Sequence, residues 1–106
     1  MKNITQEEWK SLTEKDKSAV IIDSRSPEEC EMGIIENALM INIMDTVDFN
    51  EKAANLDPSK NYYVYCRSGV RSIKACNVLE SLGLNTTFNL LGGIVEWNGK
   101  TVIPKI

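Results

Sequence analysis

The stretch Asn61-Tyr62-Tyr63-Val64-Tyr65-Cys66-Arg67-Ser68-Gly69-Val70-Arg71-Ser72 changes character at its midpoint. Its first five residues are mostly aromatic and β-branched, which is typical of a β-strand. From Ser72 to Leu82 the apolar side chains fall on one helical stripe, and Gly83 is well placed as the left-handed residue that ends a helix. A strand therefore leads through a short loop into a helix, as in α/β proteins.

The same alternation of strands and helices extends to both sides of this unit. It indicates an α/β fold with a mostly parallel sheet between helical layers, in one domain spanning residues 1–106. Two capping boxes, Thr5 to Glu8 and Ser26 to Glu29, begin two of the helices. The further predicted elements are helices over 6–14, from Pro27 to near Gly33, over 49–56 and around 94–97, and strands at 19–22, 38–43 and 86–89.

The composition excludes several classes of protein. The 106 residues contain no histidine, which excludes Ser-His-Asp hydrolysis, Cys-His proteolysis and zinc sites that need imidazole. A net charge of -3 argues against nucleic acid and against an anionic membrane as partners, since both need a basic face. The N-terminal residues lack the apolar run of a signal peptide, and no stretch approaches a membrane span. We expect a cytoplasmic protein.

Three cysteines, Cys30, Cys66 and Cys76, form neither a CxxC pair nor an even set. A disulfide framework and a four-thiolate zinc site are therefore excluded within one chain, and we expect neither a metal nor a cofactor. Cys30 and Cys76 fall on predicted helices and are expected to be core residues. A redox role for Cys76, as the partner that resolves an oxidised Cys66, is the alternative.

Cys66 is the candidate nucleophile because it follows the carboxyl end of a predicted parallel strand and precedes a helix. Ligand sites in open parallel sheets usually lie at this edge. Gly69 lets the loop turn so that amide hydrogens point inward, while the helix N-terminus, Arg67 and Arg71 add positive charge. These features favour a thiolate and need no histidine. The alternative is that Cys66 is a small buried apolar residue at the end of the strand, and that Arg67 and Arg71 are solvated surface charges.

Three segments in the same order resemble single-domain rhodaneses, the thiosulfate sulfurtransferases. Cys66 to Ser72 is similar to their active-site loop, Asp23 to Glu29 to their Asp-x-Arg segment, and Leu91 to Trp97 to their Gly-Gly-x-x-x-Trp ending. Gly33 to Ala38 departs from the family's Gly-His-Ile-Pro-Gly-Ala, which affects local packing. The resemblance implies a rhodanese-like three-layer sandwich with a central, mostly parallel five-stranded sheet and helices on both faces.

The resemblance also implies a reaction. Cys66 takes the outer sulfur of a small anionic donor such as thiosulfate, becomes a persulfide, and passes the sulfur to cyanide, a thiol or a sulfur-relay protein. Asp23 would brace the site and Arg25 would tie neighbouring loops, or else Asp23 caps a turn and Arg25 pairs with Glu28 or Glu29. The residues that would bind the donor and the persulfide are Arg67, Ser68, Gly69, Val70, Arg71 and Ser72, although the Ser72 hydroxyl could instead cap the helix.

Two alternatives remain open at this stage. Cys66 could carry persulfide for a partner protein with little turnover of its own. Phosphatase or arsenate reductase chemistry is less favoured, because related phosphatases place five residues between Cys and Arg, whereas four lie between Cys66 and Arg71.

Overall fold

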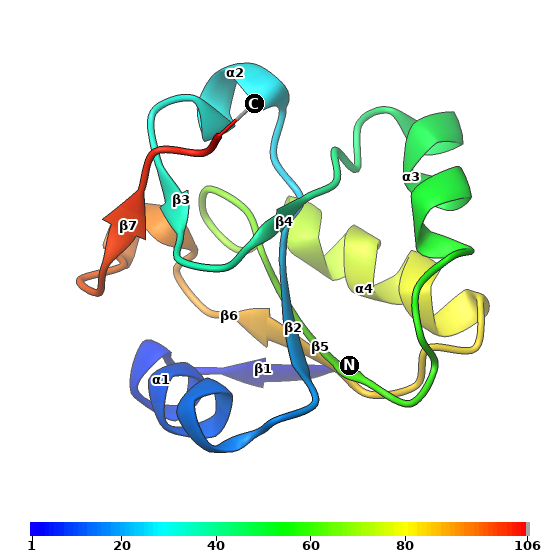
Figure 1. Cartoon of the computed structure of the whole chain (residues 1–106), viewed down its shortest axis with the longest axis horizontal. Helices are drawn as coiled ribbons and strands as arrows, with labels where there is room; N and C mark the ends of the chain where they lie inside the picture. Colours follow the sequence, from blue (N-terminus) through cyan, green and yellow to red (C-terminus); the bar gives the residue numbers. More distant parts are fainter. Residues whose placement is uncertain (106) are drawn as a thin grey trace.

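The computed structural model describes residues 1–105, and its centre is a parallel sheet (Figure 1). Within these residues the sheet has five strands in the order β1-β6-β5-β2-β4, and every neighbouring pair is parallel. This confirms the predicted sheet. Its strands are β1 (Lys2–Ile4), β2 (Ala19–Asp23), β4 (Leu39–Met40), β5 (Asn61–Tyr65) and β6 (Thr87–Leu90).

Helices cover both faces of this sheet, which gives the predicted three layers (Figure 1). On one face lie α3 (Thr46–Ala53) and α4 (Arg71–Ser81), and on the other lies α1 (Gln6–Lys15). Two short elements, α2 (Pro27–Cys30) and the 3₁₀ turn η1 (Ile94–Glu96), follow strands β2 and β6. No helix within residues 1–105 combines the length and the apolar character needed to cross a membrane.

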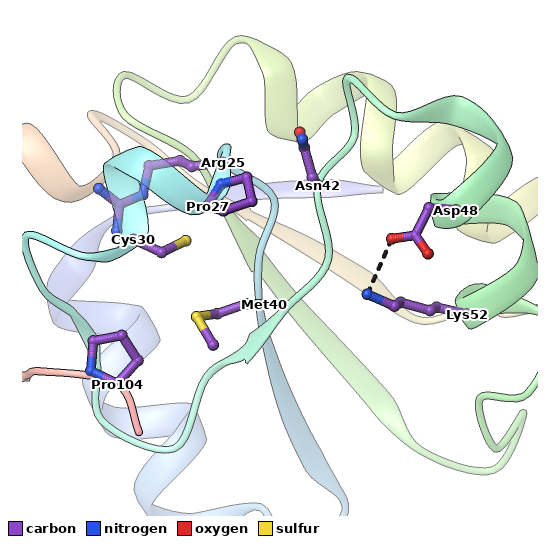
Figure 2. Close-up of a pocket in the computed structure, with 8 residues that line it drawn as sticks. All are labelled: Arg25, Pro27, Cys30, Met40, Asn42, Asp48, Lys52 and Pro104. Carbon is purple, nitrogen blue, oxygen red and sulfur yellow. Dashed lines mark ion pairs between the residues drawn. The ribbon is translucent and has the colours of Figure 1, made fainter. Parts of the chain in front are cut away.

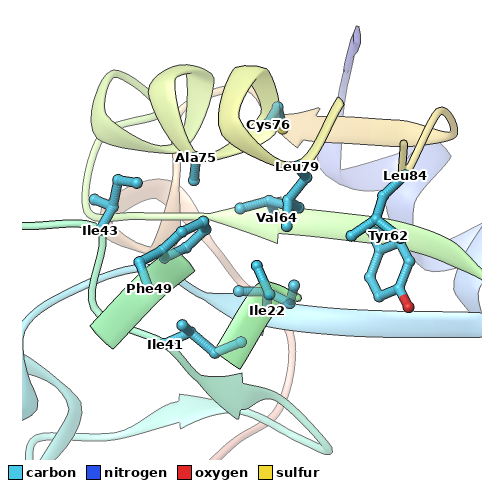
Figure 3. Packing of buried hydrophobic residues seen from close by; sticks show 11 residues of the cluster. Ile22, Ile41, Ile43, Phe49, Tyr62, Val64, Ala75, Cys76, Leu79 and Leu84 are labelled. Atoms are coloured by element: carbon cyan, nitrogen blue, oxygen red, sulfur yellow. The ribbon is translucent and has the colours of Figure 1, made fainter. Parts of the chain in front are cut away.

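Strand β5 joins the two halves of the core because its side chains alternate between the faces of the sheet. Tyr62 and Val64 pack with Phe49 of α3 and with α4 (Figure 3). Tyr63 and Tyr65 pack on the other face with Trp9 of α1. Burial on both faces explains the unbroken apolar run that predicted this strand.

Several boundaries differ from the predictions. Helix α3 begins at Thr46 rather than at Phe49, because the Asp45 carboxylate caps it by accepting a hydrogen bond from the Asp48 amide at 3.1 Å. The strand predicted over 38–43 is shorter in the structure, where only β4 is a strand. Strand β1 was not predicted, because residues 2–4 contain no apolar run. A small antiparallel pair, β3 (Ile34–Ile35) with β7 (Thr101–Val102), was also not predicted.

The loop after β5 is anchored on the segment that follows β6. The amides of Ile94 and Val95 donate to the carbonyls of Cys66 and Arg67, each at 3.0 Å. Gly93 makes this close approach possible, since a Cβ at that position would collide with the Arg67 carbonyl group, and its φ is +58°. The Gly-Gly motif therefore lets the segment after β6 bind the backbone of the cysteine loop.

Gly93→Ala is expected to lower the free energy of unfolding by about 3 kcal/mol or more, because the Arg67 peptide must move. Gly83→Ala is the matched control, since Gly83 also has a positive φ but a Cβ added there would meet nothing within 4 Å. It should cost only about 1 to 2 kcal/mol of backbone strain. Urea unfolding measures both, and equal losses would contradict the steric argument.

Candidate active site

Cys66 lies directly after β5, next to the end of β2, where Tyr65 is paired with Asp23. Its exposed fraction is 0%, so the thiol is covered in this structure. Two hydrogen-bond donors point at its sulfur: the Gly69 amide at 3.1 Å and the Ser72 hydroxyl at 3.4 Å. The sulfur is therefore enclosed, but by groups that can stabilise a negative charge.

Opposing effects act on the pKa of Cys66. Burial is the largest and raises the pKa, because it penalises the charged form. The Ser72 hydroxyl and the backbone amides of Ser72, Gly69 and Ser68 all lower it by hydrogen bonding to the thiolate. The hydrogen bonds outweigh burial, and the pKa lies below the ordinary value of a cysteine.

The other two cysteines show what burial does without such a loop. Cys30 and Cys76 are also buried, and burial raises the pKa of each thiol to about 12. At Cys30 the Asp23 carboxylate contributes to this rise in pKa after burial. Both side chains belong to the buried interior, as predicted, and Cys66 is the thiol that the protein favours as a thiolate.

Ser72 does not cap helix α4, so that interpretation is wrong. The N-cap position is Val70, which makes no side-chain cap, and Ser72 lies inside the first turn. Its hydroxyl contacts both the Cys66 sulfur and the Oδ1 atom of Asn89. The hydroxyl is thus part of the sulfur's surroundings.

Asn89 is a site residue that the sequence analysis missed. It is buried on β6, and its Oδ1 atom shares the single Ser72 hydroxyl hydrogen with the Cys66 sulfur. Its amide group donates to the Gly69 carbonyl at 3.1 Å and to the Asn3 side chain at 2.9 Å. It therefore holds two of the residues that contact the sulfur. The available signal was an asparagine between Phe88 and Leu90 in a predicted strand, where an amide needs buried partners.

The two loop arginines occupy different surroundings. Arg67 is exposed, as are Ser68 and Val70. The Arg71 guanidinium makes a two-pronged contact with the Glu29 carboxylate of α2, with distances of 2.7 and 2.8 Å. Its charge is therefore matched by a carboxylate, which the sequence analysis did not anticipate.

Asp23 and Arg25 form a buried ion pair of 2.7 Å beside the site. Arg25 also donates to the backbone carbonyls of Gly33 at 2.7 Å and Glu29 at 3.4 Å. It thus joins the segments before and after α2. The alternative ion pair from Arg25 to the Glu28 or Glu29 carboxylate is wrong, because the partner carboxylate is that of Asp23.

A pocket of about 230 Å³ opens beside α2, β4 and α3, and Figure 2 shows Cys30 and Met40 on its wall. Cys66 is not among the residues that line this pocket. Its lining consists of Arg25, Pro27, Cys30, Met40, Asn42, Asp48, Lys52 and Pro104. No group of three potential metal ligands occurs within residues 1–105.

Comparison with known proteins identifies the family to which this fold belongs. A family model described as a rhodanese-like domain matches residues 5–100. A rhodanese-like domain protein from Staphylococcus aureus has a crystal structure with a TM-score of 0.82 and 36% identity, over 99% of this chain and all of that one. The chain therefore belongs to the rhodanese-like family.

Named relatives include more than one kind of protein. YtwF of Bacillus subtilis, whose name gives it as a candidate sulfurtransferase, is 37% identical over 95% of this chain and 94% of its own length. A sulfurtransferase of Allochromatium vinosum is 33% identical over 74% of this chain and 70% of its own. A tRNA uridine(34) hydroxylase of Cytophaga hutchinsonii is 32% identical over 91% of this chain, which corresponds to 31% of that protein.

Ser72→Ala should raise the pH midpoint of Cys66 alkylation by about one unit, because a hydrogen bond to a charged group contributes about 1.5 to 3 kcal/mol. Ser68→Ala is the control, since Ser68 acts on Cys66 through its backbone amide and that amide remains. Alkylation with iodoacetamide between pH 5 and 10, followed by mass spectrometry, measures both. A Ser72→Ala midpoint equal to that of the wild type would contradict the role of the hydroxyl.

Proposed function

We propose that this protein is a sulfurtransferase that moves sulfane sulfur from a donor such as thiosulfate to cyanide or a thiol. The observation that carries the proposal is the pair of hydrogen-bond donors at the buried Cys66 sulfur, the Gly69 amide at 3.1 Å and the Ser72 hydroxyl at 3.4 Å, which favour the thiolate. A thiolate is the nucleophile that sulfur transfer requires. Family membership and relatives that are named sulfurtransferases support the same reaction class.

In the first step the Cys66 thiolate attacks the outer sulfur of thiosulfate. A sulfur-sulfur bond forms at Cys66, the donor's own sulfur-sulfur bond breaks, and sulfite leaves with the electron pair. In the second step cyanide or a thiolate attacks the outer sulfur of the persulfide, and Cys66 is released as a thiolate. Charge is conserved in both steps, and neither an oxidant nor a reductant is consumed.

The Gly69 amide and the Ser72 hydroxyl would stabilise the negative sulfur between the two steps, as an oxyanion hole stabilises developing charge. Arg67 is exposed at the same loop and is the cation available to attract an anionic donor. Because Cys66 is covered, loop side chains must move before a donor reaches it. That step can limit the rate.

A second candidate is a persulfide carrier, in which Cys66 receives sulfur from a partner protein. The observation that favours it is the exposed Val70, which leaves 71% of its surface in solvent on the cysteine loop itself. A single exposed apolar side chain is common on protein surfaces, so the carrier remains the second candidate. Rapid loading by a cysteine desulfurase, with slow turnover of thiosulfate, would favour the carrier.

Incubation of the intact protein with thiosulfate should add one sulfur atom to Cys66, and cyanide should remove it with release of thiocyanate. Cys66→Ser should abolish the adduct, whereas Cys30→Ser and Cys76→Ser should retain it, because the pKa of each of these buried thiols is about 12. Intact-mass spectrometry makes the measurement. An adduct that persists in Cys66→Ser would rule out the proposed nucleophile.

A further inference from the structure

Glu29 and Arg71 form an ion pair at the edge of the cysteine loop, although 42 positions separate them in the chain. Both guanidinium prongs are engaged, at 2.7 and 2.8 Å, and each side chain is only 29% exposed. This contact with Arg71 is the main reason that the pKa of Glu29 falls to about 2. Glu29 is therefore negatively charged at any pH at which Cys66 reacts.

The position of the Glu29 carboxylate is also fixed from its own helix. It is the third residue of α2 and completes the capping box with Ser26, accepting from the Ser26 amide at 3.4 Å and from its hydroxyl at 3.1 Å. A carboxylate that caps a helix and binds an arginine in two places has little freedom to withdraw when an anion arrives. The Arg71 guanidinium is therefore held in its ion pair with the Glu29 carboxylate.

The Glu29–Arg71 pair lowers the net positive charge that an anionic substrate would meet at the cysteine loop. Arg71 is the first residue of α4 and adjoins Ser72, whose hydroxyl contacts the Cys66 sulfur at 3.4 Å. The guanidinium and the Glu29 carboxylate bound to it therefore lie on the cysteine loop, and the Cys66 thiolate helps to raise the pKa of Arg71. The carboxylate offsets the favourable charge of Arg71 and repels an incoming anion. Repulsion grows with the charge of the donor, so a dianion is penalised more than a monoanion.

We propose that Glu29 is a specificity-determining residue, which disfavours doubly charged sulfur donors at the Cys66 loop relative to singly charged ones. The proposal rests on the proposed function. Thiosulfate carries two negative charges, whereas an organic thiosulfonate presents the same kind of transferable outer sulfur with one. In either case the Cys66 thiolate attacks that sulfur, and sulfite or an organic sulfinate leaves with the electron pair.

Glu29→Gln removes the charge, frees the Arg71 guanidinium and retains a side chain that can complete the capping box. It should raise kcat/KM for persulfide formation by about tenfold with thiosulfate and about threefold with methanethiosulfonate, mainly by lowering KM. The ratio of kcat/KM for thiosulfate to kcat/KM for methanethiosulfonate should therefore rise about threefold. Glu28→Gln is the matched control, since Glu28 is exposed on the same helix and makes no ion pair with Arg71. Its ratio should equal that of the wild type.

A second readout needs no sulfur transfer: protection of Cys66 from iodoacetamide by sulfate and by methanesulfonate. Sulfate should protect Glu29→Gln at about tenfold lower concentration than the wild type, with a smaller change for methanesulfonate. The role of Glu29 is overturned if Glu29→Gln leaves sulfate protection unchanged and does not raise the ratio of kcat/KM for thiosulfate to kcat/KM for methanethiosulfonate. This holds even if Cys66 forms a persulfide. Altered sulfate protection without any persulfide supports the role of Glu29 and overturns the proposed function instead.

Discussion

A negatively charged sulfur atom is stable inside a protein only if hydrogen bonds replace the water that it has lost. Cys66 meets this condition, because the Gly69 amide and the Ser72 hydroxyl are directed at its sulfur. Burial without such donors has the opposite result at Cys30 and Cys76, where it raises the pKa of each thiol to about 12. The conformation of the loop, rather than the presence of a thiol, therefore favours the thiolate form at this position.

That conformation depends on strand β6 and the segment that follows it. Asn89 of β6 binds the Gly69 carbonyl and the Ser72 hydroxyl, which holds both donors at once. After the strand ends, Gly93 lets the backbone approach the Arg67 carbonyl closely enough for two amides to anchor the loop. The parallel pairing of β5 with β6 thus positions the site as well as forming part of the sheet.

Charge around the site is more balanced than the arginines of the sequence indicate. Arg25 is neutralised by Asp23 and Arg71 by Glu29, so two of the three arginines near Cys66 are matched by carboxylates. Arg67 is exposed on the loop. The backbone amides and one hydroxyl therefore provide most of the local stabilisation of the thiolate.

The amino-acid sequence by itself determined the α/β class, the unit of strand, loop and helix around Cys66, and both capping boxes, because each depends on residues close together in the chain. Strand β1 and the contacts of Asn89 with Gly69 and of Glu29 with Arg71 were decided only by the tertiary structure. Their partners are distant along the chain and meet only after the sheet has formed. Local patterns carry no information about which distant groups will lie together in the folded protein. Those groups determine how readily Cys66 ionises and how the charges around it are paired.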